Sequence, residues 1–204
     1  MQIYYDQNYV RVIDGVLDSE FCEHLITVFE SQQQWHRERP GNYARLIELD
    51  MRSSDNNLGK EFRKQPWLKA RGDYNWDTDN QLIMQQVLAQ ADDYKQRWDP
   101  LNMMPTEFAS EGLRMKCYRP NGYHEFKTHV DQANRGSATR FLAFLFYLND
   151  SDAGTEFFNP GVTVDARQGR LVMFPPTWQY AHRGLMPKDG QTKYIMSTYL
   201  HYAS

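Results

Sequence analysis

The spacing of apolar residues along the chain changes near residue 110. Before this point apolar side chains mostly recur every three or four positions, which is typical of helices that cover a core. After it they occur in short runs that alternate with polar residues and are separated by turn residues, as in strands. The sequence therefore predicts a mainly helical support region over residues 1–110 and a β-rich region over residues 111–204.

Two helices are expected in the first region. Val10–Val16 predicts a short strand, and Asp18 then caps a helix that runs to about Gln34. His36-Arg37-Glu38 follows this helix and leads into a turn, so we expect a solvated loop there. Ala44–Leu49 is a further candidate strand.

The second helix is expected to begin at a cap formed by Asp77 or Thr78 and to end near Trp98. Asp99-Pro100 stops it, because proline cannot continue a helix. Its expected buried face consists of Leu82, Ile83, Val87, Leu88, Ala91 and Tyr94.

About eight short strands with tight turns between them are predicted for the second region, which is the pattern of a sandwich or barrel. With the helices on one outer face, this gives an α+β fold. The absence of internal repeats indicates a single domain over residues 1–204. The predicted strands are Leu113–Tyr118, Phe126–Asp131, Arg140–Leu148, Thr155–Phe157, Val162–Val164, Arg170–Phe174, Tyr180–Leu185 and Tyr194–Tyr202.

Composition narrows the class of protein. An apolar fraction of 41%, a charged fraction of 24% and a net charge of -3 are ordinary for a globular protein, and the acidic balance argues against nucleic acid as the main partner. No apolar run reaches the length of a membrane span, and no signal peptide is recognisable at the N-terminus. Cys22 and Cys117 form no paired motif, so we expect buried thiols in a reduced, cytoplasmic protein.

The candidate chemistry starts from histidine followed two residues later by an acid. With six histidines and 26 acidic residues, on the order of one such pair is expected by chance. The sequence contains two, His36-Arg37-Glu38 and His129-Val130-Asp131. Residues i and i+2 of a strand point to the same face, so only the second pair, at the end of a predicted strand, can bring both side chains to one ion.

A third ligand must come from elsewhere in the chain, and His182 lies late in the strand series. Strands distant in sequence lie side by side in a barrel, so His182 can join His129 and Asp131. Two imidazoles and one carboxylate on one face of an octahedron leave positions open, which suits Fe(II) oxygen chemistry. Structural zinc requires four ligands, usually with cysteine, which this sequence does not offer.

The chain resembles the prolyl 4-hydroxylase-like branch of the Fe(II)/2-oxoglutarate-dependent dioxygenases. Val12–Cys22 is similar to the opening strand and capped helix of that family, and the resemblance is weak over residues 36–110. The motifs that carry it occur in the family's order: His129-Val130-Asp131, Arg140–Asn149, Gly154–Phe157, Gly169–Pro175, and His182 followed by Gly190-Gln191-Thr192-Lys193.

The resemblance implies a double-stranded β-helix, a jelly-roll or cupin-like barrel, and roles for individual residues. Lys193 would bind the distal carboxylate of 2-oxoglutarate, assisted by Tyr118 and Thr155. The turn before Thr155 is one residue shorter than in the family, which leaves open whether Thr155 or Glu156 faces the co-substrate. Arg140 and Tyr199 match positions that line the substrate cleft.

The activity implied is hydroxylation of a prolyl or other residue of a protein or peptide, with release of succinate and CO2. The cofactors implied are Fe(II), 2-oxoglutarate and O2, with ascorbate as a further candidate. Three alternatives stay open: the same chemistry on a free small molecule such as an amino acid, a non-catalytic barrel used for binding or assembly, and nucleobase demethylation, which fits the acidic balance poorly. The sequence predicts no oligomeric state.

Overall fold

One antiparallel sheet of 13 strands organises the described part of the chain. The computed structural model describes residues 1–40, 44–51, 74–188 and 190–203. The helices are α1 (Ser19–Ser31) and α2 (Asp77–Trp98), and short 3-10 turns are η1 (Gln33–Trp35), η4 (Arg135–Ser137) and η5 (Trp178–Tyr180). The strands are β1 (Gln2–Gln7), β2 (Val10–Asp14), β3 (Arg37–Pro40), β4 (Ala44–Asp50), β5 (Phe108–Ser110), β6 (Arg114–Tyr118), β7 (Glu125–His129), β8 (Arg140–Tyr147), β9 (Ser151–Phe157), β10 (Val162–Ala166), β11 (Leu171–Phe174), β12 (His182–Gly184) and β13 (Lys193–Tyr202).

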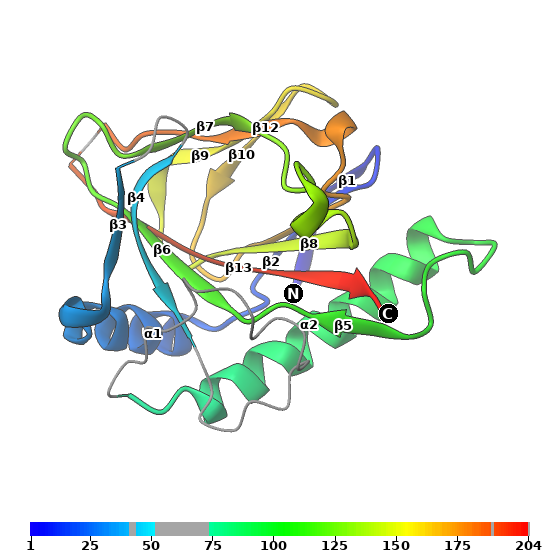
Figure 1. The fold of residues 1–204 in the computed structure, drawn as a ribbon, viewed down its shortest axis with the longest axis horizontal. Helices are drawn as coiled ribbons and strands as arrows, with labels where there is room; N and C mark the ends of the chain where they lie inside the picture. The colour runs from blue at the N-terminus through cyan, green and yellow to red at the C-terminus, as the bar shows by residue number, and fades with distance from the viewer. Residues whose placement is uncertain (41–43, 52–73, 189, 204) are drawn as a thin grey trace.

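The sheet folds over into two layers. Its strand order is β1-β2-β11-β8-β13-β6-β4-β7-β12-β9-β10, with β3 beside β4 and β5 beside β13. In Figure 1, β7, β12, β9 and β10 form an upper layer over β6, β13, β8 and β2, and both helices pack outside the lower layer. This arrangement is the predicted double-stranded β-helix with N-terminal helices on one face, and similar solved structures described below confirm that class of fold.

Strand β8 separates two apolar cores by the parity of its side chains. Leu142, Phe144 and Phe146 face outward and pack with the buried stripes of α1 and α2, whereas Leu145 and Tyr147 face the interior of the barrel. Alternation of this kind follows from the pleat, which sends successive side chains to opposite faces. The helices therefore pack against the outer face of the lower layer and stabilise it.

The N-terminal part of the chain contributes more strands than expected. Strands β2 and β4 were predicted, whereas β1, β3 and β5 were not. Strand β4 lies inside the sheet, between β6 and β7, and β2 pairs with β11. Residues before 111 therefore complete the barrel as well as covering it, because an interior strand of a sheet can come from any part of the chain.

The predicted loop around His36 is wrong. Arg37–Pro40 forms β3, which pairs with β4, and the His36 ring stacks on Phe29 with 4.1 Å between ring centroids. The His36 Nε2 atom lies 2.8 Å from the Phe29 carbonyl oxygen. Among the described strands β3 pairs only with β4, and a polar edge strand of this kind lacks the apolar alternation by which a local pattern would reveal it.

The helices differ from expectation at their ends and faces. Helix α1 ends at Ser31 and passes into η1 instead of reaching Gln34, and α2 has Trp76 at its cap position with no side-chain cap. Leu82 and Leu88, expected on the buried face of α2, are exposed. Ile83 and Val87 are fully buried there, and the two leucines lie on either side of that stripe, outside the contact with the sheet.

The predicted cap of α1 is confirmed, since the Asp18 carboxylate accepts a hydrogen bond from the Phe21 backbone N–H at 2.7 Å. We expect Asp18→Ala to lower the free energy of unfolding by about 1 kcal/mol, because that N–H loses its acceptor. Thermal denaturation should show a melting temperature lower by about 2–4 °C. Glu23→Ala, an exposed change on the same helix, serves as the control, and an equal loss in both variants would contradict the capping role.

Candidate metal centre

Two histidines face each other across neighbouring strands of the upper layer. His129 is the last residue of β7 and His182 the first of β12, and the two are directly paired in the antiparallel register. Paired residues place their side chains on the same face, which brings the ring centroids to 4.3 Å from each other. The barrel interior therefore receives both imidazoles from one register pair.

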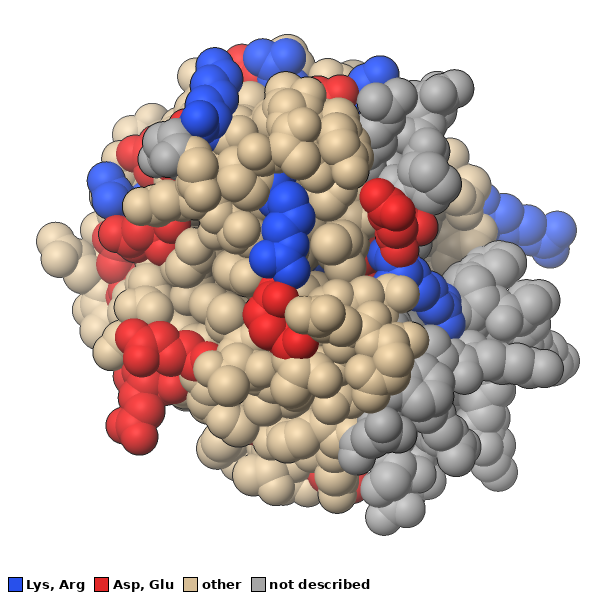
Figure 2. Space-filling view, turned by 90° about the vertical axis from the view of Figure 1, so that its left-hand side faces the viewer, with Lys and Arg blue, Asp and Glu red and all other residues tan. Residues whose placement is uncertain are grey.

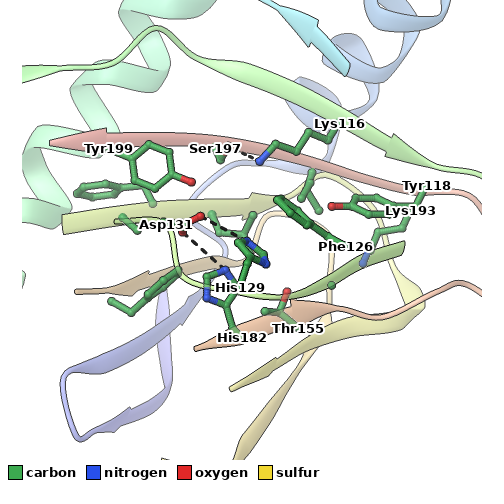
Figure 3. Close-up of a pocket in the computed structure, with 16 residues that line it drawn as sticks. Lys116, Tyr118, Phe126, His129, Asp131, Thr155, His182, Lys193, Ser197 and Tyr199 are labelled. Carbon is green, nitrogen blue, oxygen red and sulfur yellow. Dashed lines mark hydrogen bonds and ion pairs between the residues drawn. The ribbon is translucent and has the colours of Figure 1, made fainter. Parts of the chain in front are cut away.

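Asp131 completes the group from just beyond β7. The predicted strand through Asp131 ends two residues earlier, at His129, and Asp131 lies in a bend. Its Oδ1 lies 3.4 Å from His129 Nε2, and its Oδ2 lies 3.6 Å from His182 Nε2 (Figure 3). One ligand atom from each of the three residues lies within 4.8 Å of the others, the only such group of metal-ligating side chains among the described residues.

The orientation of both imidazoles is set by backbone carbonyls. His129 Nδ1 lies 2.7 Å from the Lys127 carbonyl oxygen, and His182 Nδ1 lies 3.0 Å from the Tyr180 carbonyl oxygen. A carbonyl can only accept, so Nδ1 carries the proton in each ring and the Nε2 lone pair is left for a metal. Phe126 stacks on the His129 ring at 3.6 Å and fixes its plane.

The protonation states also suit a cation. Burial lowers the pKa of His182, which favours the neutral ring that binds metal. Burial alone would raise the pKa of Asp131, but interactions with His182 and His129, in the protonated forms that these rings take when no metal is bound, outweigh it and hold that pKa well below its usual value. An ionised carboxylate and neutral imidazoles are the forms that coordinate a divalent ion.

A pocket extends from these three side chains between the two layers. Lys193, Tyr118 and Thr155 lie toward its other end (Figure 3). Lys193 is fully buried, and its Nζ donates to the Leu185 carbonyl at 2.9 Å and to the Gly154 carbonyl at 3.4 Å. Its Nζ also lies 4.2 Å from the centre of the Tyr118 ring. Among the described residues, its hydrogen-bond acceptors are neutral carbonyls, so the buried ammonium has no carboxylate in contact.

Thr155, rather than Glu156, faces the pocket. Thr155 is buried, and its Oγ1 accepts a hydrogen bond from the Tyr147 hydroxyl at 2.7 Å. Glu156 points to the other face of β9, where its carboxylate accepts a hydrogen bond from Arg183. Because successive side chains of a strand point to opposite faces, only Thr155 of these two adjacent residues can face the co-substrate pocket. This settles the question that the shortened turn had left open.

Gly184 provides room for a ligand beside Lys193. A Cβ atom at this position would lie 3.5 Å from the Tyr118 hydroxyl and 3.7 Å from Lys193 Nζ. A side chain here would therefore fill the space in front of the ammonium and the phenol. A bare position between a buried cation and a hydroxyl donor fits a carboxylate group, for which such charge-assisted contacts are strong.

Arg140 and Tyr199 lie against Asp131. Arg140 donates to both carboxylate oxygens of Glu111, at 2.7 and 2.9 Å, and to the Asp131 carbonyl at 2.7 Å. Its guanidinium lies 3.9 Å from the centre of the Tyr199 ring, and Tyr199 lines the pocket. These contacts hold the Asp131 backbone in place. Whether either residue also contacts substrate stays a prediction.

The four remaining histidines lie outside the pocket lining. His24 contacts Asp79, His36 packs on Phe29, and His124 accepts a hydrogen bond from the Arg119 N–H. His201 is buried with its Nε2 2.8 Å from Glu111. Each has a structural partner.

Sequence reasoning gave no role to several residues that line the pocket, among them Lys116, Phe126 and Ser197. Strand parity could have found two of them, because Lys116 lies two residues before Tyr118 on β6 and Ser197 lies four residues after Lys193 on β13. Phe126 carried no signal, since an aromatic residue on a strand is ordinary core.

A protein-family model matches the part of the chain that holds the candidate site. Residues 113–201 match the 2OG-Fe(II) oxygenase superfamily. The predicted class of enzyme, a dioxygenase that uses iron and 2-oxoglutarate, is thereby confirmed, as is the resemblance to prolyl 4-hydroxylases. No protein with a curated description matches the sequence.

Solved structures of prolyl hydroxylases share the fold over almost the whole chain. A viral collagen prolyl hydroxylase from Paramecium Bursaria Chlorella virus-1 is 14% identical, with a TM-score of 0.67 over 97% of this chain and 98% of that one. A Pseudomonas putida prolyl-4-hydroxylase is 13% identical, with a TM-score of 0.68 over 97% and 95%. A Trichoplax adhaerens prolyl hydroxylase, solved with a hypoxia inducible factor peptide, is 15% identical, with a TM-score of 0.65 over 96% and 84%.

The surface offers two further observations. Acidic and basic side chains are interspersed over the described part of the face in Figure 2, which shows no broad basic patch there. Among the described residues, no helix combines the length and apolar character needed to cross a lipid bilayer.

The buried Lys193 leads to a prediction about pH. Burial lowers the pKa of Lys193 to about 7, so the free protein loses this positive charge as the pH rises through 7. A bound carboxylate favours the ammonium, so binding of 2-oxoglutarate above pH 7 should take up a proton and weaken by up to about tenfold per pH unit. Calorimetry in buffers of different ionisation enthalpy, on protein loaded with Mn(II), measures both effects.

Lys193→Arg is the matched control, because a guanidinium stays charged throughout this range. Its 2-oxoglutarate affinity should vary less with pH than that of the unchanged protein. Equal pH dependence in the two proteins would show that another group controls binding.

Proposed function

We propose that this protein is an Fe(II)- and 2-oxoglutarate-dependent hydroxylase whose metal ligands are His129, Asp131 and His182. The observation that carries the proposal is the convergence of these three ligand atoms within 4.8 Å, in a pocket that also holds the buried ammonium of Lys193. Two imidazoles and one carboxylate leave coordination positions open for the co-substrate and O2. A binding or assembly barrel needs neither this group nor a buried lysine.

The remaining pocket residues suit the two ends of the co-substrate. The distal carboxylate of 2-oxoglutarate fits in front of Lys193, where Gly184 leaves space and Tyr118 and Thr155 supply hydroxyls. When bound, iron, 2-oxoglutarate and O2 supply the oxidant that hydroxylates a C–H bond, with release of succinate and CO2. The protein orients the reactants and excludes water.

Aromatic side chains around His129 and His182 exclude water from the candidate metal centre. Phe157 and Phe174 pack at 5.4 and 4.9 Å from the His182 ring, and Phe126 covers His129. A low local dielectric strengthens the contacts between charged groups and the ligand. Arg140 and Tyr199 hold Asp131, so the carboxylate meets a metal in a fixed position.

The substrate we propose is a prolyl or another residue of a protein or peptide. The support is the fold shared with prolyl hydroxylases, one of them solved with a peptide. A free amino acid is the alternative substrate. Ascorbate, which would keep iron reduced, is proposed as an auxiliary reductant only.

The metal assignment can be tested spectroscopically. Anaerobic addition of Fe(II) and 2-oxoglutarate should produce a weak visible charge-transfer band, which requires metal and keto acid in one site. His129→Ala should abolish the band, because a facial site with two ligands holds the metal poorly. His24→Ala, a half-exposed histidine outside the pocket, should retain it. A band that survives in His129→Ala, or is absent from the unchanged protein, would refute the site.

The substrate class can be tested by succinate release. We expect proline-containing peptides to stimulate succinate formation above the rate without substrate, and free L-proline to do so less, because the proposed substrate is a peptide. Mass spectrometry should then find an added oxygen on the peptide. Stimulation by free amino acids alone would favour the small-molecule alternative.

A further inference from the structure

A second buried lysine lies in the pocket and has no part in the site as described so far. Lys116, on β6, is only 8% exposed and lines the pocket together with Lys193. Its Nζ donates to Ser197 Oγ at 3.0 Å, which fixes the position of the ammonium (Figure 3). The pocket therefore holds a second positively charged side chain beside the candidate metal centre.

The register of β6 and β13 places Lys116 one step further along β13 than Lys193, in the direction of Tyr199, which lies against Asp131. Tyr118 pairs with Lys193, and Lys116 pairs with Ile195, the next residue on the pocket side of β13. One such step along a strand is roughly 7 Å, which is comparable with the length of a five-carbon dicarboxylate. The two lysines thus stand one ligand length apart along the same pocket wall.

Contacts around Lys116 point the same way. Its Nζ lies 5.9 Å from the centre of the Phe126 ring, and that ring stacks on His129 at 3.6 Å. Burial is the main reason for the lowered pKa of both Lys193 and His182, and the positive charge of Lys116 lowers each further. The positive charge of Lys116 therefore interacts electrostatically with His182 at the metal end of the pocket and with Lys193 at the other end.

From this geometry we infer that Lys116 binds the metal-side carboxylate of 2-oxoglutarate, while Lys193 binds the distal one. The inference rests on the proposed function and adds to it a second cation for the co-substrate. The dianion would be held at both ends by the protein, in addition to its bonds to iron. Ser197 acts as a positioning residue, since it contacts Lys116 and holds the ammonium toward the ligand.

A buried acid near Lys116 is consistent with this role. Glu48, on β4, is the register partner of Lys116 and is buried at 6% exposure. Paired residues of an antiparallel sheet share a face, so a negative charge lies on the same side as the ammonium. Glu48 offsets part of the cost of burying Lys116. An ammonium has three N–H groups, so donation to Ser197 is compatible with donation to a further acceptor.

Binding of two different keto acids can distinguish contacts to the metal-side carboxylate from contacts to the distal carboxylate. 2-Oxoglutarate has both carboxylates, whereas 2-oxopentanoate keeps the metal-side carboxylate and has a methyl group at the other end. Dissociation constants are measured by calorimetry on Mn(II)-loaded protein. Lys116→Met should weaken both keto acids by the same factor, on the order of tenfold to a hundredfold, because both lose one charge-assisted contact. Lys193→Met should weaken 2-oxoglutarate alone.

The other outcomes overturn the inference. A loss confined to 2-oxoglutarate in Lys116→Met would mean that Lys116 serves the distal carboxylate. Unchanged affinity for both keto acids would mean that Lys116 does not contact the co-substrate. Failure of the unchanged protein to bind either acid would instead refute the proposed function, so the two failures are distinct.

Two more variants control for folding and charge. Lys95→Met removes a lysine from α2, outside the pocket, and should leave both dissociation constants unchanged. Ser197→Ala keeps the ammonium but removes its hydroxyl acceptor, so it should weaken both keto acids alike by a smaller factor. If Lys116→Met does not fold, Ser197→Ala alone tests the inference. Unchanged affinities of Ser197→Ala for both keto acids would then overturn it.

Discussion

The candidate site depends on one register pair, His129 with His182, in the antiparallel ladder between β7 and β12. A shift of one residue would send one imidazole to the opposite face of the sheet, since side chains alternate with a period of two. The register is held from both sides. Strand β4 pairs with β7, and β9 pairs with β12, so neither site strand is an edge.

Asp131 is held differently, because it lies beyond the end of β7 and has no ladder of its own. Arg140 at the start of β8 donates to its carbonyl and is itself held by Glu111. His201 near the end of β13 bonds to the same Glu111 carboxylate. The backbone of Asp131 is thus tied to two strands of the lower layer, and the candidate metal group joins both layers of the barrel.

The pocket beyond the metal group is defined by buried positive charge. Lys193 and Lys116 are both buried in the pocket, where an ammonium is costly to desolvate. Helices α1 and α2 help to make this arrangement stable, since they bury the outer face of the lower layer and leave its inner face for the site. The dicarboxylate co-substrate that we propose would compensate this charge.

Much of the fold was determined by the sequence alone. All eight strands predicted after residue 110 are present, as are both helices and the cap at Asp18, because pleat parity, helical spacing and turn residues are local properties. Local pattern also paired His129 with Asp131. Local pattern did not reveal strands β1, β3 and β5. Strands β1 and β3 each pair with a single neighbouring strand and lack the apolar alternation of an interior strand, whereas β5 depends on the distant β13.

Only the tertiary structure decided how the site is assembled. It placed His182 opposite His129, turned Thr155 rather than Glu156 into the pocket, and brought Lys116 beside Ser197. Each outcome depends on which strands pair and in what register, which no residue's own neighbours specify. Sequence determined which chemical groups were available and on which side of a strand each would lie, whereas long-range pairing determined which of them meet.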